Sequence, residues 1–389
     1  MKDAPMTLVP ALLLSLFADT QLVSQPEPVD LEAVTAIRHE GFHYSEAMDT
    51  IEHLTEKIGP RISNSPAQRE AAEWCRDQLA EWGLKNATLE PWGEFGRGWS
   101  FTHATLHMIA PHPIPLVALP VAWTPGTDGP IRGEAMRADI ESEDDFEEFE
   151  GKLEGKILLF DDARDVKTDD APFLTRHSED HLCSIEEFPI PGESRSDWRD
   201  RAIKRWKVRA ALADFLTEQG VVAILTLSSR DAGVIRVTGN PSYEPGENPG
   251  PPRLAVATEH YNRIMRHLDR DETVTLEVDV KATFHEEETT GYNVIAEIPG
   301  TTRAHEVVML GGHLDSWHAG TGATDNAAGV TVAMEAVRIL SALEIKPRRT
   351  IRIALWTGEE QGLLGSRGYV ERHFASRPET DDPEQLELP

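Results

Sequence analysis

A strand–loop–helix–strand pattern over residues 293–358 constrains the fold of this chain more than any other feature. Apolar stretches at 293–300, 306–312 and 349–358 predict strands, and the last reads like a buried parallel strand. The stretch at 326–343 predicts a helix that places Val330, Ala333, Met334, Val337 and Leu340 on one face. Strands alternating with helices indicate helices packed on a sheet, so we predict an α/β fold with a mostly parallel sheet flanked by helices.

The middle of the chain differs in character from its two ends. Between about residues 116 and 284, short apolar strands alternate with loops rich in Pro and Gly. We therefore assign residues 116–284 to an inserted β-rich domain, and residues 26–115 and 285–389 to the two parts of the α/β domain. Two helices around the turn GPRISNSP, residues 59–66, are expected in the first part.

The extreme N-terminus resembles an export signal. Met6–Ala18 is apolar and of signal-peptide length, and a polar stretch with prolines follows it. We predict that residues 1–25 are a signal peptide and that the protein is secreted or periplasmic; the alternative is a cytoplasmic protein with a short buried helix there.

Composition argues against several other classes of protein. The chain has 38 basic and 67 acidic residues, a net charge of −29, which repels nucleic acid. No apolar run reaches the ~20 residues that a membrane-spanning helix needs. The two cysteines, Cys75 and Cys183, are too few for a disulfide framework or a cysteine-based metal site.

Polar residues follow the predicted strands at one edge of the sheet. His313 comes directly after the strand at 306–312, Asp325 precedes the next helix, and Glu359 and Glu360 follow the strand at 349–358. Ligands bind outside the carboxyl ends of parallel strands, so we expect these four side chains to share a site. An imidazole with carboxylates suits a divalent ion, most often zinc. Asp315 is placed to accept the second ring N–H of His313.

Each of these residues alone has a simpler interpretation. Asp325 fits a helix N-cap, paired glutamates are usually solvated, and a His beside two glycines is usually a turn residue. Their combination at one edge favours a metal site. Adjacent glutamates cannot both reach one ion without strain, so one is expected to ligate while the other acts as general base.

Three motifs carry a resemblance to a known family: GGHLDSW at 311–317, ATDNAAG at 323–329 and WTGEEQGLLGS at 356–366. They resemble the zinc exopeptidase family of aminopeptidase Y and glutamate carboxypeptidase, most closely carboxypeptidase Q. The opening helices match as well, and the insert resembles a protease-associated domain. The resemblance covers most of the chain after about residue 45.

The resemblance implies a role for each site residue. His313 ligates one zinc ion, Asp325 bridges two, and Glu360 ligates the second. Glu359 acts as general base, and Asp315 orients His313. It also implies a cis peptide between Asp325 and Asn326 and two zinc ions in the full-length protein.

One departure from the family pattern concerns the C-terminus. The family supplies a further acidic ligand and a further His, whereas the last residues here contain acids but no apolar strand. We therefore leave the acids of this stretch unassigned: Asp381, Asp382, Glu384 and Glu387. The expectation is a chain truncated at its C-terminus, with an incomplete fold there and an activity of its own that stays open.

The resemblance implies a zinc-dependent exopeptidase that hydrolyses terminal peptide bonds of peptides or dipeptides. The residues do not decide between an aminopeptidase and a carboxypeptidase or dipeptidase. Two other functions stay open: an inactive fragment or pseudoenzyme that acts as a binding module, and a one-zinc enzyme like glutaminyl cyclase. We also expect peptide substrates and a possible homodimer. Nucleic acid is not expected as a partner, and no membrane-spanning segment is expected.

Overall fold

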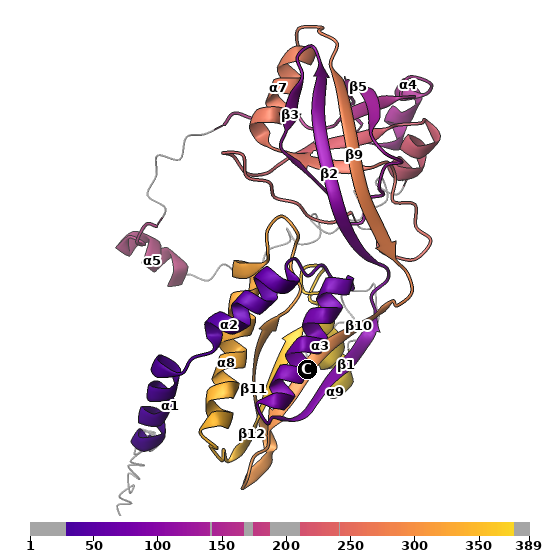
Figure 1. Cartoon of the computed structure of the whole chain (residues 1–389). Helices are drawn as coiled ribbons and strands as arrows, with labels where there is room; N and C mark the ends of the chain where they lie inside the picture. The colour runs from indigo at the N-terminus through magenta and orange to yellow at the C-terminus, as the bar shows by residue number, and fades with distance from the viewer. Residues whose placement is uncertain (1–28, 141, 167–173, 187–210, 241, 377–389) are drawn as a thin grey trace, which may run out of the picture.

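The computed structural model describes residues 29–140, 142–166, 174–186, 211–240 and 242–376. Within these ranges the strands form two sheets, one of four strands and one of eight. Figure 1 shows the two sheets at opposite ends of an elongated molecule, joined by the long strands β2 and β9. The predicted signal peptide lies outside the described residues, so export stays a prediction.

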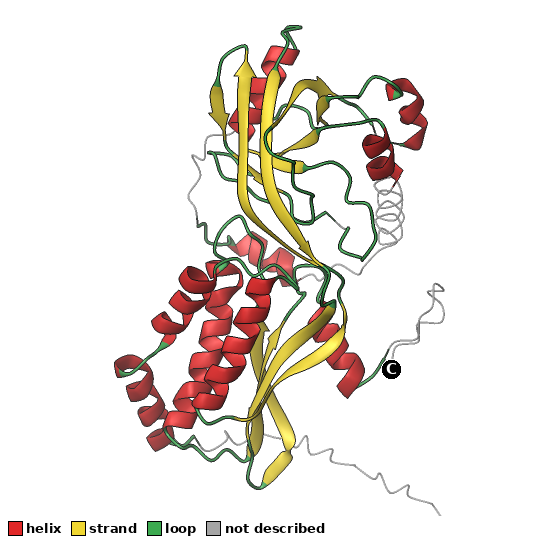
Figure 2. Ribbon diagram, turned by 45° about the vertical axis from the view of Figure 1, so that its right-hand side comes forward, coloured by secondary structure: helices red, strands yellow, loops and turns green. Residues whose placement is uncertain are grey.

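The small sheet has the strand order β1-β10-β12-β11. Its strands are β1 (Lys85–Glu94), β10 (Thr290–Ile298), β11 (Arg303–His313) and β12 (Arg349–Trp356). Helices α3 (Pro66–Glu81) and α8 (Ala328–Ala342) cover one face, and α9 (Leu364–His373) lies on the other (Figure 2). Three short N-terminal elements precede them: α1 (Leu31–His43), α2 (Ala47–Glu52) and the π-helical turn η1 (His53–Ile58).

The helices of this part follow from local sequence signals. Ser65 caps α3 by accepting a hydrogen bond from the Gln68 main-chain N–H at 3.2 Å, and Pro66 occupies the first turn. Helix α8 buries Val330, Ala333, Met334 and Val337 on the face that the sequence predicts. These side chains pack with residues of β10, β12 and α3 into one core between helices and sheet.

The large sheet has the order β3-β2-β9-β5-β6-β7-β8-β4. Its strands are β2 (Gly98–Ala110), β3 (Ile114–Leu116), β4 (Ala118–Pro120), β5 (Ile131–Arg137), β6 (Lys156–Leu159), β7 (Ala223–Leu227), β8 (Arg253–Val256) and β9 (Thr275–His285). The helical elements along this part of the chain are η2 (Glu143–Asp145), α4 (Phe146–Phe149), α5 (Glu179–Glu186), α7 (Thr258–Leu268) and residues 211–218. Strands β5 to β8 run parallel, while β2 and β9 form a long antiparallel pair.

The structure moves one boundary that the sequence suggested. Residues 98–110, which we assigned to the first part of the α/β domain, form β2 and pair with β9 along their length. The chain leaves the small sheet after β1 and returns to it at β10, and these two strands are antiparallel neighbours. The second unit therefore begins near residue 98 and not near residue 116. Its identity as a protease-associated domain stays a prediction.

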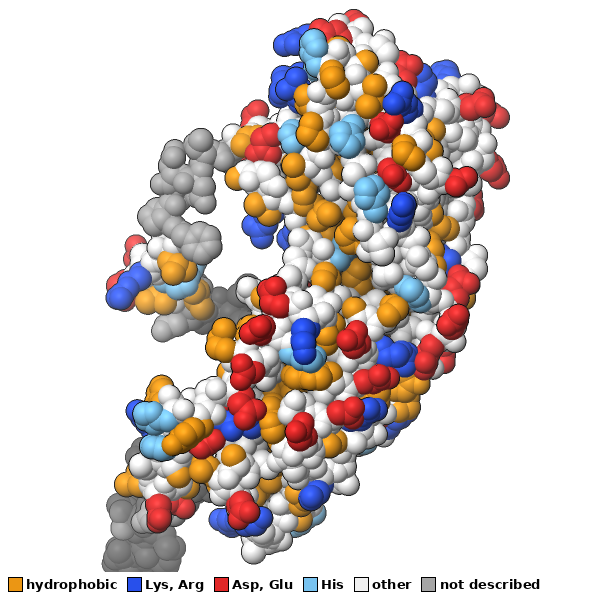
Figure 3. Space-filling view, viewed as in Figure 1, with side chains coloured by type: hydrophobic (Ala, Val, Ile, Leu, Met, Phe, Trp, Pro, Cys, Tyr) orange, Lys and Arg blue, Asp and Glu red, His pale blue; other side chains and the backbone are white. Residues whose placement is uncertain are grey.

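The α/β class is confirmed, but parallel pairing is less extensive than we expected. In the described part of the small sheet, β11 and β12 run parallel, joined by α8, whereas β10 runs antiparallel to both β1 and β12. The insertion explains this, because the chain re-enters beside β1 in the opposite direction. Among the described residues, no helix has the length and apolar character to cross a membrane. Acidic side chains are scattered over the face shown in Figure 3, with basic ones between them.

Candidate metal centre

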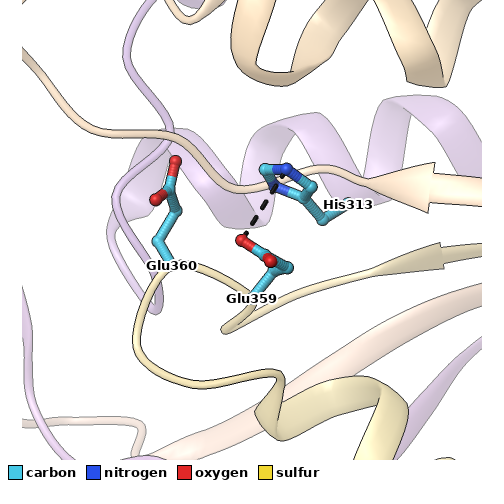
Figure 4. A group of neighbouring side chains, drawn as sticks. All are labelled: His313, Glu359 and Glu360. Atoms are coloured by element: carbon cyan, nitrogen blue, oxygen red, sulfur yellow. Dashed lines mark ion pairs between the residues drawn. The ribbon is translucent and has the colours of Figure 1, made fainter. Parts of the chain in front are cut away.

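The predicted site residues converge at the carboxyl end of β11. His313, the last residue of that strand, places Nε2 3.0 Å from Asp325 Oδ1 and 3.7 Å from Glu359 Oε2. One ligand atom from each of His313, Glu359 and Glu360 lies within 4.8 Å of the other two. Figure 4 shows Glu359 directed at the His313 ring, with Glu360 beside it on the same loop. The two adjacent glutamates thus both lie in the cluster.

Asp315 lies behind His313 and is fully buried. His313 Nδ1 is 3.1 Å from the Asp315 main-chain oxygen and 3.6 Å from its carboxylate Oδ1. The carboxylate Oδ2 accepts hydrogen bonds from Ser63 Oγ and from the Glu360 main-chain N–H, both at 3.1 Å. Asp315 therefore occupies Nδ1 and leaves Nε2 facing the carboxylates. The closer contact comes from its main chain, not from the side chain that we expected.

A glycine pair brings His313 to the edge of the sheet. A Cβ on Gly311 would lie 1.8 Å from the Ala354 carbonyl oxygen, so only glycine permits the approach of β11 to β12 at this point. The Leu314 main-chain N–H then donates to the Trp356 carbonyl at 2.7 Å. The ends of the two strands are thereby fixed side by side, with His313 on one and the glutamate loop on the other.

Buried Asn293 holds the glutamate loop at both ends. Its Nδ2 donates to the Gly365 carbonyl at 2.9 Å, and its Oδ1 accepts from the Thr357 N–H at 3.2 Å. The Trp92 indole N–H adds a hydrogen bond to Thr357 Oγ1 at 2.9 Å. Glu359 and Glu360 thus sit on a loop anchored by neighbouring strands.

Asp325 reaches the site from the turn η3 (Ala323–Ala327). The Asp325–Asn326 peptide is cis, as the resemblance implies. Helix α8 begins at Ala328, and no side chain caps its N-terminus. Asp325 is therefore not a helix N-cap, which was the simpler interpretation of its position in the sequence. Its side chain is 73% exposed and open to a ligand on one side of His313.

Comparison with known proteins relates this chain to a family of peptidases. Residues 293–382 match the model of peptidase family M28. Carboxypeptidase Q of Mus musculus is 25% identical over 342 residues, which cover 86% of this chain and 63% of that protein. A peptidase M28 precursor from Shewanella amazonensis SB2B is 28% identical, with a TM-score of 0.57 over 88% of this chain and 71% of that one. Over residues 293–382 this chain is thus similar to peptidase family M28.

A third comparison supports the fold alone. BSAP, a zinc aminopeptidase from Bacillus subtilis, is 19% identical, with a TM-score of 0.50 over 85% of this chain and 65% of its own. This chain spans 63% of the length of the mouse relative and 60% of carboxypeptidase Q from Bos taurus.

The charges at this site are arranged for a cation. Burial lowers the pKa of His313, but Asp315, Glu359 and Asp325 outweigh burial and raise this pKa to about 9. Burial, together with the charges of Asp325 and Asp315, raises the pKa of Glu360 to about 7. Without a metal ion, the imidazolium of His313 is the positive charge that balances these carboxylates.

The donor set fits zinc. It combines one imidazole nitrogen with carboxylate oxygens, and Asp315 fixes the other ring nitrogen. Among the described residues, Glu360 Oε1 is buried without a hydrogen-bond partner, although burying a carboxylate oxygen is costly unless something compensates it. A cation held between His313, Asp325 and Glu360 would supply that compensation. The unassigned acids Asp381, Asp382, Glu384 and Glu387 lie outside the described residues.

Sequence reasoning missed the residues that support this site. Arg61 and Ser63, in the turn that we described only as a helix connection, contact the loop after His313. The signal was a single charged residue, the arginine, in a turn that otherwise holds only glycine, proline, small polar residues and Ile62. A pocket of about 240 Å³ lies beside the same turn, with Trp99, Phe101 and His318 among its walls.

Proposed function

We propose that this M28 chain is a zinc-dependent exopeptidase that hydrolyses terminal peptide bonds. The observation that carries the proposal is the convergence of His313 Nε2 with the carboxylates of Asp325, Glu359 and Glu360 at one sheet edge. The comparisons support it, since the relatives are named as peptidases and one structural neighbour as a zinc enzyme.

His313, Asp325 and Glu360 are the proposed zinc-holding residues. His313 offers Nε2, because its Nδ1 faces Asp315. Asp325 lies on the exposed side of the imidazole, where it can also reach the second ion that the resemblance implies. Zinc, when bound, polarises the scissile carbonyl as a Lewis acid.

Glu359 is the proposed general base. It is partly exposed, and its Oε2 faces the site at 3.7 Å from His313 Nε2. From there its carboxylate takes a proton from the attacking water and returns it to the amine that leaves when the peptide bond breaks. Asp315 holds the imidazole in one orientation throughout and touches no substrate atom.

The substrate is proposed to be a peptide with a free terminus. The relatives named carboxypeptidase Q and aminopeptidase point to opposite ends of a peptide, so the choice needs an experiment. Dipeptides blocked at the amine and dipeptides blocked at the carboxylate distinguish the two. Loss of hydrolysis on blocking the amine indicates an aminopeptidase, whereas loss on blocking the carboxylate indicates a carboxypeptidase.

The test of the whole proposal measures zinc content and hydrolysis of unblocked dipeptides together. We expect bound zinc and turnover that a chelator abolishes. The Glu359→Gln variant is expected to retain zinc and to lose about 100-fold or more in kcat. Glu371→Gln, on the exposed surface of α9, is the matched control and should change neither quantity.

Other outcomes would overturn the proposal. A chain that binds peptides without zinc and without turnover would be a binding module. Cyclisation of N-terminal glutamine in place of hydrolysis would indicate the cyclase alternative.

A further inference from the structure

Arg61 is fully buried in the turn between η1 and α3. Its guanidinium donates hydrogen bonds to the main-chain carbonyls of Leu54, Gly59, Leu314, Thr321 and Gly322, at distances from 2.8 to 3.1 Å. No described carboxylate lies close enough to form an ion pair with it. The side chain is therefore devoted to holding main chain in place.

Three of these carbonyls belong to two of the segments that carry site residues. Leu314, which accepts from Nε at 2.8 Å, lies between His313 and Asp315. Thr321 and Gly322, which accept from Nη1 and Nη2 at 3.0 and 2.9 Å, directly precede the turn that carries Asp325. The planar fork of one guanidinium thus spans the two segments.

The main chain of Arg61 reinforces the same connection. Its N–H donates to Ser316 Oγ at 3.1 Å, and its carbonyl accepts from the Ser316 N–H at 3.0 Å. At Gly322, whose φ is +66°, a Cβ would lie 2.9 Å from Arg61 Nη2 and 2.4 Å from Ser316 Oγ. The loop is packed so closely on the guanidinium that a small displacement of Arg61 shifts it.

A buried positive charge is costly for stability, and carbonyl hydrogen bonds offset that cost only in part. Burial lowers the pKa of Arg61 below its ordinary value, which is the signature of that cost. An apolar side chain could fill the same space, but it could not fix three loops by hydrogen bonds. The role of Arg61 is therefore to hold these segments at fixed positions relative to one another.

We propose that Arg61 is a positioning residue that sets the distance between His313 and Asp325 and so determines zinc affinity. The proposal rests on the zinc site described above and assigns Arg61 no contact with metal or substrate. His313 Nε2 and Asp325 Oδ1 are 3.0 Å apart in the arrangement that Arg61 holds. Loosening either loop removes one of the two donors from a common centre.

The experiment compares Arg61→Lys with Arg97→Lys. Arg97 is a matched control: it is 5% exposed and donates to the carbonyls of Ser242 and Glu247, away from the site. Lysine keeps the charge in both variants but not the planar fork. Zinc affinity by competition with a chelating dye, the visible spectrum of the Co²⁺-loaded chain, and unfolding in urea are measured for each.

Arg61→Lys is expected to weaken zinc binding by about ten-fold or more and to alter the Co²⁺ spectrum. Arg97→Lys should unfold at lower urea concentration but bind zinc within about two-fold of the unaltered chain. Equal zinc affinity and identical Co²⁺ spectra in Arg61→Lys and the unaltered chain would overturn the proposal. An unaltered chain that binds no zinc would instead refute the proposed function.

Ser316→Ala is a second variant that tests the same proposal if Arg61→Lys does not fold. This variant removes the hydrogen bond from the Arg61 N–H but retains the guanidinium and its contacts. A loss of a few-fold in zinc affinity, with a changed Co²⁺ spectrum, supports the proposal. Unchanged affinity in a folded Ser316→Ala chain counts against it.

Discussion

Both sheets have polar side chains at the carboxyl ends of parallel strands, but the hydrogen bonding of these side chains differs between the two sheets. In the large sheet, Asp161 follows β6, and its Oδ2 accepts from the Leu227 N–H at 2.7 Å. Its main chain exchanges two hydrogen bonds of 2.9 Å with the Tyr261 hydroxyl. In the small sheet, by contrast, buried Glu360 Oε1 and Asp315 Oδ1 have no hydrogen-bond partner among the described residues.

The difference shows what a sheet edge needs in order to become a site. Strand topology brings polar residues together in both places. At the large sheet, the polar groups of Asp161 form hydrogen bonds with neighbouring loops and strands of the same chain. These groups are therefore already satisfied. At the small sheet, four carboxylates and one imidazole crowd together and repel or attract one another without being satisfied. Buried acceptor oxygens without a partner indicate a ligand more strongly than position at a sheet edge does.

The largest expected effect separates the two edges directly. His313→Ala removes the imidazole ligand and should reduce zinc affinity by at least about 100-fold. Asp161→Ala leaves the Leu227 N–H unpaired and should cost about 1–3 kcal/mol of unfolding free energy with zinc affinity unchanged. Calorimetric zinc titration and urea unfolding measure both. Equal zinc loss in the two variants would mean that the edges do not differ.

The second prediction concerns pH in the metal-free chain. A folded-state pKa of about 9 for His313 means that its protonation stabilises the fold fully below the ordinary pKa of 6.5. This stability is lost as pH rises through 9, and we expect a loss of about 2–3 kcal/mol. Glu360, with a pKa raised to about 7, contributes in the same direction between its ordinary 4.5 and 7.

Urea unfolding at several pH values tests this. The His313→Gln variant should flatten the dependence between pH 6.5 and 9, while zinc affinity in the unaltered chain should rise with pH because the ligands must lose protons. Stability that rises between pH 6.5 and 9 without metal would contradict the prediction.

The sequence predicted the α/β class but not the strand pairings, and it placed four candidate residues at one sheet edge. His313, Asp325, Glu359 and Glu360 were found because each follows a recognisable strand or precedes a helix, and the strand ends meet. Their proposed roles remain to be tested. The assignment of β2 failed because its partner strand lies far away in the sequence and leaves no local sign of the pairing. The register joins Gly98 to His285 and Ala110 to Thr275.

The supporting residues were missed for a related reason. Arg61 forms its hydrogen bonds with main-chain carbonyls, which every residue has. Its partners therefore cannot be recognised from a side-chain motif in the sequence. The antiparallel direction of β10 in the sheet could not be predicted either, because the apolar pattern of a strand does not show the direction of its neighbours. Sequence periodicity identifies elements, whereas loop contacts and strand direction depend on the assembled fold.

The third prediction tests whether support for the site is graded. Ser63→Ala removes one of the two hydrogen bonds to Asp315 Oδ2 and should weaken zinc binding by a few-fold, at a cost of about 1 kcal/mol in stability. Ser228→Ala is its counterpart at the large sheet, where Ser228 Oγ donates to the Val234 carbonyl at 2.9 Å. It should lower stability similarly and leave zinc binding unchanged. A zinc effect of equal size in both would refute a specific role for Ser63.

The smallest effect concerns the strands at the sheet margins. The large sheet ends in β3 and β4, which are three residues each, whereas the small sheet as described ends in β11, an 11-residue strand. Three consecutive apolar residues of β11 are exposed: Val307, Val308 and Met309. A long apolar edge strand can pair with another chain, and a charged residue on it opposes such pairing.

Val308→Lys should therefore reduce self-association of the chain at high concentration while changing unfolding free energy by less than about 0.5 kcal/mol. Val332→Lys on helix α8 is the matched control, since Val332 is also an exposed valine, at 70%, and gains the same charge away from any strand edge. Sedimentation velocity over a range of concentrations measures both variants. If the two lysines reduce association equally, net charge is responsible and the edge of β11 is not. If only Val308→Lys does so, the open edge is the surface through which copies of this chain meet, and the homodimer that the sequence suggested would have its interface there.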